Sequence, residues 1–142
     1  MTDVAYIALG SNLGRREDYL ALARRELEAL PGTRIVAASA VEETPPIGPV
    51  AQGPFLNQML AVRTSLAPHE LLEAMHAIER RAGRVRGERW GPRTLDLDIV
   101  AMDHQRCDDP RCRVPHPELE HRDFWQRQLA EVRARLGDEP GA

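Results

Sequence analysis

Two stretches with helical periodicity divide this chain, and each lies between two short strand-like segments. Within residues 15–30 and 65–82, apolar side chains recur every three or four positions, which places them on one face of a helix. The strand-like segments are 3–9, 33–43, 55–64 and 95–101. This order of strand, helix, two strands, helix and strand predicts an α+β fold, the ferredoxin-like βαββαβ arrangement of an antiparallel sheet with both helices on one face.

The rest of the chain predicts loops and one further helix. The segments without regular periodicity are 44–54, 83–94 and 114–124. Residues 125–136 have a helical pattern and predict a C-terminal helical extension, after which we expect a frayed tail at about 137–142. The length of 142 residues is that of one ordinary domain, so we expect a single domain over residues 1–142.

Charge and composition limit the expected partners. The formal net charge is −3 and 42% of the residues are hydrophobic, so no basic field attracts nucleic acid or a membrane surface. No apolar run is long enough to span a bilayer, and the first residues lack the pattern of a signal peptide. We therefore expect a cytoplasmic protein that binds neither nucleic acid nor membrane.

All 19 basic residues are arginine, since the sequence has no lysine. This excludes a P-loop, whose lysine reaches the phosphates, and it excludes Schiff-base chemistry. A phosphate ligand would therefore be bound by arginine side chains, metal ions and backbone amides. Cys107 and Cys112 are too few for a disulfide framework and are not spaced as CxxC, so we expect two reduced thiols without a role.

Two aspartates in the last strand-like segment suggest a metal site. Because side chains alternate along a strand, Leu97 and Ile99 would face a core while Asp96 and Asp98 point together to the other face. Residues two apart in a strand lie roughly 6.5–7 Å apart, so the two carboxylates can hold one divalent ion or bridge two. Oxygen ligands without His or Cys suit Mg²⁺. The alternative is a solvated strand face, but aspartate is a poor strand former.

The arginine-rich stretch 80–93 precedes these aspartates. Arginine forks bind phosphate oxygens in pairs, so this stretch beside an acidic strand indicates a site for a polyanion and its metal. A solvated basic surface is the alternative, and it applies best to Arg80 and Arg81 on the outer face of the helix.

A second candidate pocket involves the segment "TPPIGP" at 44–49, whose prolines restrict the backbone. Phe55 offers an aromatic plane, and the Asn57 amide can both donate and accept hydrogen bonds. Such a set suits a flat, polar heterocycle, with Trp90 and Phe124 as further stacking surfaces. Packing in the core is the alternative role for Phe55.

The motifs together resemble one family. "RWGPRTLDLDI" at 89–99 is similar to the signature of the 6-hydroxymethyl-7,8-dihydropterin pyrophosphokinases. Further segments resemble that family in the same order, and they are "VAYIALGSNLG" at 4–14, "TPPIGP" at 44–49, "FLN" at 55–57, "TSLAPHELL" at 64–72, "IERRAGRVR" at 78–86 and "VPHPEL" at 114–119. The resemblance covers roughly residues 4–124, and a long signature with several ordered motifs is a specific signal.

The resemblance implies the ferredoxin-like α+β fold and a monomeric enzyme of folate biosynthesis, which transfers pyrophosphate from ATP to the hydroxymethyl group of the reduced pterin. It implies ATP as co-substrate, a pterin as the other small-molecule substrate, and two Mg²⁺ ions held by Asp96 and Asp98. The catalytic residues it implies are Arg84, Arg93, Asp96 and Asp98. Those for ATP are Glu79, Trp90, Arg93, Ile99, Arg111, Arg113, His116 and Arg122. Those for the pterin are Thr44, Pro46, Ile47, Phe55, Asn57, Trp90, Asp96 and Phe124.

The sequence departs from the family pattern at a few positions. Phe55 stands where the family often has tyrosine, and after Phe124 the chain is more polar than the apolar segment usual there. Two alternatives to the enzyme therefore stay open: a catalytically impaired homologue that binds nucleotide, and a ferredoxin-like RNA-binding module. The second lacks the aromatic-rich strand of an RNA-recognition motif.

Overall fold

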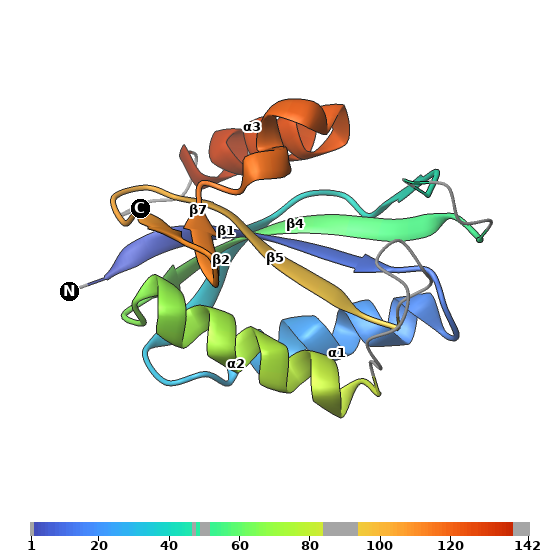
Figure 1. Cartoon of the computed structure of the whole chain (residues 1–142), viewed down its shortest axis with the longest axis horizontal. Helices are drawn as coiled ribbons and strands as arrows, with labels where there is room; N and C mark the ends of the chain where they lie inside the picture. Colours follow the sequence, from blue (N-terminus) through green and yellow to red (C-terminus); the bar gives the residue numbers. More distant parts are fainter. Residues whose placement is uncertain (1, 47, 49–51, 84–93, 138–142) are drawn as a thin grey trace.

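A computed structural model describes residues 2–46, 48, 52–83 and 94–137, and an antiparallel sheet is its centre (Figure 1). The strands of this sheet are β1 (Asp3–Ser11), β2 (Thr33–Ala38), β3 (Glu42–Thr44), β4 (Phe55–Thr64) and β5 (Asp96–Met102). Their order is β2-β4-β1-β5, with β3 also paired to β4, and each pairing is antiparallel. The long strands β1 and β4 therefore lie in the middle, and β5 is at an edge of this order.

Helices cover both faces of the sheet. They are α1 (Arg16–Glu28), α2 (Pro68–Arg81) and α3 (Asp123–Gly137). Figure 1 shows α1 and α2 on one side and α3 on the other. Between β5 and α3 come a small hairpin, β6 (Cys107–Asp109) with β7 (Cys112–Val114), and a 3₁₀ turn at Pro117–His121. Among the described residues, no helix is long and apolar enough to cross a membrane.

Local sequence accounts for α2, the helix that packs beneath β5. Pro68 occupies its first turn, where the N–H that proline lacks would have no partner in the helix. The Glu70 carboxylate accepts a hydrogen bond from the Ala67 amide at 2.9 Å and so satisfies another free donor. Gly83, with a φ of +79°, follows the last turn in the left-handed conformation that glycine adopts without strain.

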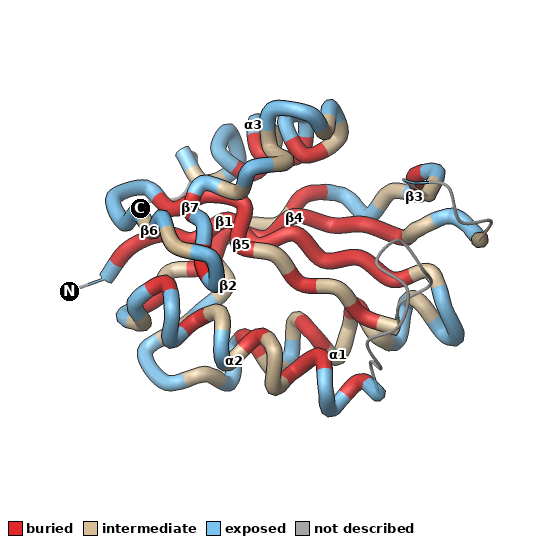
Figure 2. The backbone as a smooth tube through the Cα atoms, in the orientation of Figure 1, coloured by how far each residue is buried: buried red, intermediate tan, exposed pale blue. Residues whose placement is uncertain are grey.

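The sheet separates two cores, and most of the length of its long strands is buried (Figure 2). Leu97 and Ile99 pack with α1 and α2 in the larger core. The smaller core lies under α3, where Trp125 and Val132 contact apolar residues of β1, β4 and β5. Asp96 and Asp98 alternate with the residues of the larger core, as the sequence predicted, and both are half-buried.

Two predicted features differ from the structure. The single strand expected at 33–43 is wrong: β2 ends at Ala38, and β3 begins at Glu42. Ser39 separates them, because its hydroxyl accepts a hydrogen bond from the Met59 amide at 2.9 Å and its own amide donates to the Met59 carbonyl at 2.9 Å. The segment expected to be irregular, 114–124, contains the end of β7 and the 3₁₀ turn. The expected C-terminal helical extension is present as α3, which packs on part of the sheet face opposite α1 and α2.

The carboxylate of Asp3 joins the start of β1 to the turn that follows β5. It accepts hydrogen bonds from the amides of Val4, His104 and Gln105 at 2.9–3.0 Å and from the His104 ring at 2.9 Å. Burial would raise the pKa of Asp3, but these hydrogen bonds outweigh it and hold the pKa below its usual 3.8. The charged carboxylate therefore fixes two distant segments of the chain.

We expect the Asp3→Asn variant to unfold at lower urea concentration at pH 7. Hydrogen bonds to a charged group contribute about 1.5–3 kcal/mol to stability. The NH₂ group of the new asparagine is a donor, so it cannot accept hydrogen bonds from the backbone amides that now bind the carboxylate. Because the folded-state pKa is lowered, the stabilisation is present above pH 3.8 and is lost as the pH falls through the folded value. The measurement is urea unfolding of both proteins at pH 7 and pH 3, and an equal difference at the two pH values would contradict this account.

Candidate functional site: a cleft beside strand β5

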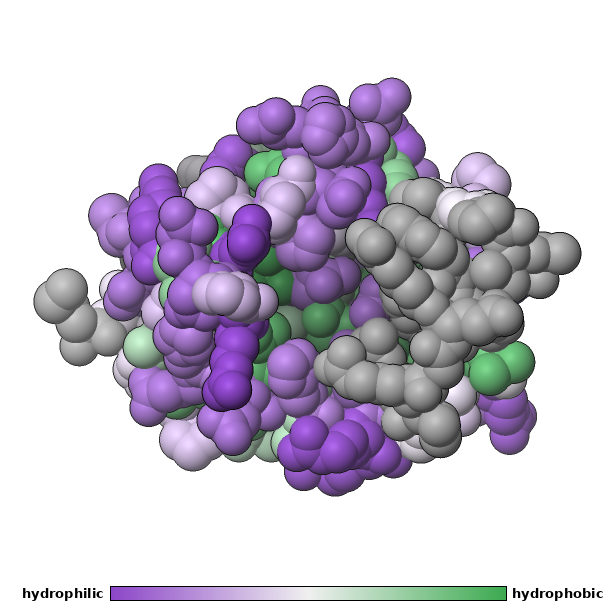
Figure 3. All heavy atoms as spheres, in the orientation of Figure 1, coloured by the Kyte–Doolittle hydropathy of each residue, from purple (hydrophilic) through white to green (hydrophobic). Residues whose placement is uncertain are grey.

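A cleft of about 650 Å³ lies beside β5, bounded by α2, the β6–β7 hairpin and the segment 116–122. Figure 3 shows the molecular surface hollowed near its centre, with hydrophilic side chains at the rim. The predicted site residues that line the cleft are Asp96, Asp98, Ile99, Arg111, Arg113, His116 and Arg122. These residues come from three separate segments of the chain. Their order is known from the sequence but their proximity is not, and the structure shows it.

The two aspartates belong to the sheet face that α3 leaves partly open. Asp96 pairs with Gly10 and Asp98 with Ala8 across the β1–β5 ladder. Since they are two residues apart on one strand, both carboxylates are on the same side. They are hard oxygen donors at the margin of a basic cleft, which is a donor set that fits Mg²⁺.

His116 presents an N–H group to the acidic side of the cleft. Its Nδ1 accepts a hydrogen bond from the Glu118 amide at 3.0 Å, so the proton of a neutral ring is on Nε2. That Nε2 lies 3.6 Å from Oδ1 of Asp98. The start of the 3₁₀ turn thus sets the tautomer of His116 and aims a hydrogen-bond donor into the site.

Arg122 is held at the cleft by Trp125 of α3. Its guanidinium carbon lies 4.3 Å from the centre of the indole ring, a cation–π distance. Its Nε is buried and has no hydrogen-bond partner among the described residues. A buried guanidinium N–H without a partner is costly, and an anionic ligand would supply the missing acceptor.

The predicted pterin residues of β3 and β4 also come together. Asn57 donates hydrogen bonds from its Nδ2 to the hydroxyl of Thr44 and to the carbonyl of Phe55, which fixes the amide orientation. Gly10 lies beside them on β1: a Cβ placed there would be 3.3 Å from Oδ1 of Asn57 and 3.4 Å from Cδ1 of Phe55. Gly10 pairs with both Asn57 and Asp96, so it lies between the amide and the acidic strand, and the Asn57 and Phe55 side chains approach its backbone closely.

Glu79 and Phe124 also do not line the cleft. Glu79 is 3% exposed, and its carboxylate accepts a hydrogen bond from the Leu97 amide at 2.8 Å, so in this structure it holds the strand that carries the aspartates. Phe124 packs at the edge of the core under α3, with its ring centre 6.3 Å from that of Trp125. Pro46 is half-buried. The predictions for Ile47, Arg84, Trp90 and Arg93 fall outside the described residues.

Sequence reasoning missed three residues near these sites. His76 lines the cleft, and its place one turn after Leu72 on α2 was the available signal. Gly10 appeared in the sequence analysis only within the motif at 4–14. Its contribution is the absence of a side chain, which residue chemistry alone does not point out. Trp125 was treated as part of a polar extension, although one of two tryptophans in a chain with 4% aromatic residues is a packing signal.

The described site is thus a mixed acidic and basic cleft that suits a polyanion together with a divalent cation. Comparison with known proteins identifies the family. The family model for 7,8-dihydro-6-hydroxymethylpterin-pyrophosphokinase matches residues 6–134. The chain belongs to this family.

Curated relatives that align with most of this chain support the family assignment. A protein of Pseudomonas aeruginosa is 46% identical over 93% of this chain and 82% of its own length. One of Bacillus subtilis is 43% identical over 93% of this chain and 79% of its length. One of Pseudomonas putida is 47% identical over 82% of this chain and 96% of its length. Each is named 2-amino-4-hydroxy-6-hydroxymethyldihydropteridine pyrophosphokinase.

Proposed function

We propose that this protein transfers pyrophosphate from ATP to the hydroxymethyl group of 6-hydroxymethyl-7,8-dihydropterin in folate biosynthesis. The hydroxymethyl oxygen forms a bond to the β-phosphorus of ATP, the bond between that phosphorus and the α,β-bridging oxygen breaks, and the hydroxyl proton is released. The products are AMP and the pterin diphosphate. The observation that carries the proposal is that the paired aspartates of β5 line one cleft together with three arginines and two histidines.

The chain's own residues bind and neutralise the triphosphate. Arg111, Arg113 and Arg122 line the cleft, and their guanidinium groups offset phosphate charge with paired N–H donors. The Nε2–H of His116 adds a further N–H donor on the side of Asp98. Arg84 and Arg93 are proposed to add charge during transfer. Phosphoryl transfer depends mainly on such positioning and electrostatics, because it leaves the protein little covalent chemistry to do.

Asp96 and Asp98 are proposed to hold two Mg²⁺ ions. When bound, the ions neutralise the triphosphate and polarise its phosphoryl oxygens. Asp98 is also the candidate acceptor of the hydroxyl proton, since a carboxylate within hydrogen-bond reach can act as general base.

The pterin is proposed to lie beside Asn57 and Phe55, near Gly10. Oδ1 of Asn57, which lies close to Gly10, can accept a hydrogen bond from an N–H of the heterocycle, while Phe55 offers a flat apolar surface beside it. Pro46, Ile47, Trp90 and Phe124 are proposed to complete the enclosure. We further propose that Glu79 and Ile99 support the adenosine.

The finer fold assignment is also a proposal. The antiparallel order β2-β4-β1-β5, with two helices on one face, supports a ferredoxin-like βαββαβ unit over a single domain, to which β3, the β6–β7 hairpin and α3 are added. We propose that it acts as a monomer, and the cytoplasmic location stays a prediction. The family assignment does not favour the RNA-binding module.

The direct test is AMP release from MgATP with and without 6-hydroxymethyl-7,8-dihydropterin. AMP that depends on the pterin and on Mg²⁺ is the expected result. A folded protein that binds MgATP but forms no AMP with the pterin would replace this proposal with the impaired homologue.

Gly10→Ala is expected to weaken pterin use selectively. The added methyl group would press on Asn57, whose amide is held by Thr44, and a misplaced methyl group in a binding pocket costs between about 10- and 200-fold in specificity. The measurement is the KM for the pterin at saturating ATP. Gly137→Ala is the matched control, because a Cβ there meets no atom within 4 Å, and an equal KM for both variants would place the pterin elsewhere.

A further inference from the structure

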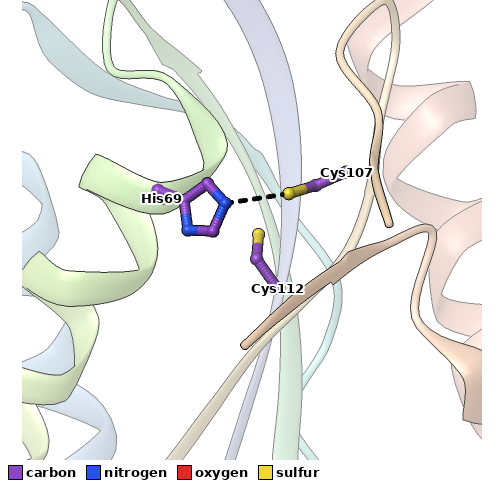
Figure 4. Close-up of side chains that lie close together, drawn as sticks. All are labelled: His69, Cys107 and Cys112. Carbon is purple, nitrogen blue, oxygen red and sulfur yellow. Dashed lines mark hydrogen bonds between the residues drawn. The ribbon is translucent and has the colours of Figure 1, made fainter. Parts of the chain in front are cut away.

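Three metal-ligating side chains meet at a place that the proposed reaction does not use. His69 is in the first turn of α2, Cys107 is in β6 and Cys112 is in β7. Figure 4 shows the imidazole and the two thiols pointing toward one another. Nε2 of His69 and the two sulfur atoms all lie within 4.8 Å of one another, so residues up to 43 positions apart in the sequence form one compact cluster.

The distances are close to those of a metal site. Sγ of Cys107 is 3.2 Å from Nε2 of His69. In a tetrahedral zinc site, with Zn–S near 2.3 Å and Zn–N near 2.1 Å, a sulfur and a nitrogen ligand lie about 3.6 Å apart. The cluster therefore needs only small side-chain movements to surround an ion.

Asp109 offers a fourth donor and is already oriented by the hairpin turn. Its Oδ1 accepts hydrogen bonds from the amides of Arg111 at 2.9 Å and Cys112 at 3.1 Å. Its Oδ2 lies 2.8 Å from Nε2 of His69 and 3.5 Å from Sγ of Cys107. The turn thus fixes one oxygen and presents the other to the cluster, and such outer contacts orient the ligands of metal sites.

The donor set selects the kind of ion. Two thiols and an imidazole suit borderline-soft Zn²⁺, and they are poor ligands for Mg²⁺, which prefers oxygen. We propose that His69, Cys107 and Cys112, with Asp109 as the fourth donor, form a binding site for Zn²⁺ that joins the β6–β7 hairpin to the start of α2.

Zinc binding at this site must release protons. Both thiols lose their protons to form zinc–thiolate bonds, so one Zn²⁺ binds with the release of two protons. Burial, and next the hydrogen bond with Cys107, raise the pKa of Cys112 to about 12, so without the ion this thiol is protonated at neutral pH.

The site would also order part of the cleft. The hairpin that carries the cysteines also carries Arg111 and Arg113, and Cys112 itself lines the cleft. The ion would therefore fix the segment that bears two of the arginines proposed for the nucleotide. The zinc site stands on its own geometry, and its test needs no turnover.

The test is a Co²⁺ titration of the reduced, metal-free full chain in excess Mg²⁺, followed by Zn²⁺. We expect one equivalent of Co²⁺ to give thiolate charge-transfer absorption and tetrahedral d–d bands, and one equivalent of Zn²⁺ to abolish them. Zn²⁺ should also raise the thermal unfolding midpoint, because the ion binds the folded chain.

Variants assign the ligands. Cys107→Ser and Cys112→Ser are each expected to reduce the charge-transfer absorption by about half, since each removes one of two thiolates. Because Cys112 is buried and its replacement can unfold the chain, His69→Gln is the deciding variant: the side chain of His69 is 56% exposed. It should weaken Zn²⁺ binding at least about tenfold without changing the metal-free unfolding midpoint.

The exposed His121 supplies a matched control, since His121→Gln removes an imidazole outside the cluster and should leave Zn²⁺ binding unchanged. Co²⁺ binding without thiolate bands, or equal Zn²⁺ affinity for His69→Gln and the wild type, would overturn the proposal. So would a Cys107–Cys112 disulfide in the purified chain that yields no Zn²⁺ binding after reduction.

Discussion

Asp98→Asn is expected to lower pterin-dependent AMP formation about a thousand-fold. The change keeps the size of the side chain but removes a charge that is proposed to hold Mg²⁺ at the triphosphate. Metal ions contribute several kcal/mol to such a transition state, and about 4 kcal/mol corresponds to roughly three factors of ten in rate. The measurement is kcat and kcat/KM at saturating Mg²⁺, together with the Mg²⁺ dependence of ATP binding.

The stability of this variant separates a catalytic role from a structural one. Without a metal, neighbouring carboxylates on one strand repel each other, so Asp98→Asn should unfold at the same or a higher urea concentration than the wild type. Asp18→Asn is the control with the same change in charge, because Asp18 lies on α1 with a side chain 67% exposed. Near-normal turnover by Asp98→Asn would remove this carboxylate from the proposed metal site.

The sequence predicted those parts of the fold that depend on local patterns. The strand expected at 55–64 has those same bounds as β4, and the helix expected over 65–82 is α2 at Pro68–Arg81. Both segments bury a continuous apolar face, and the spacing of apolar residues along the sequence predicts burial of that kind. The orientation of Asp96 and Asp98 followed from the same reasoning.

The parts that the sequence did not reveal depend on distant contacts. The break between β2 and β3 is made by Ser39 bonding to Met59, across the sheet. The β6–β7 hairpin has strands of three residues each, too short for a recognisable alternation. The neighbour of the two cysteines is His69, which is 38 positions from Cys107, so spacing within the sequence cannot identify the cluster.

Some residues of the candidate site were predicted from their chemistry and others from the resemblance to the family. The acidic pair could be derived from strand alternation, whereas Arg111, Arg113 and His116 were named only through the family motifs. The structure brings these residues to one cleft, and their roles in binding ATP stay predictions. The polar character of the sequence after Phe124 was a poor guide, because Trp125, Leu129 and Val132 form a buried apolar face of α3.

Trp125 connects the stability of the fold to the cleft, and Trp125→Ala is expected to damage both. The indole is 2% exposed in the core under α3, and removing a buried tryptophan costs about 3–5 kcal/mol. The ring also packs edge-on against His116, with ring centres 5.0 Å apart, and under the guanidinium of Arg122 at 4.3 Å. We therefore expect weaker ATP binding beyond the loss of stability, measured by calorimetry under conditions where the variant remains folded.

A second substitution separates packing from positioning. Trp125→Phe keeps an aromatic face for His116 and Arg122 but leaves a smaller cavity, so it should recover part of the lost stability and most of the ATP affinity. Trp125→Leu keeps apolar volume without a ring, and it should recover stability without recovering affinity. If both variants bind ATP equally well, the ring does not position these side chains, and α3 contributes to the cleft only by covering the sheet. If they differ as expected, the C-terminal helix is part of the nucleotide site, because its one buried indole determines where a histidine and an arginine meet the ligand.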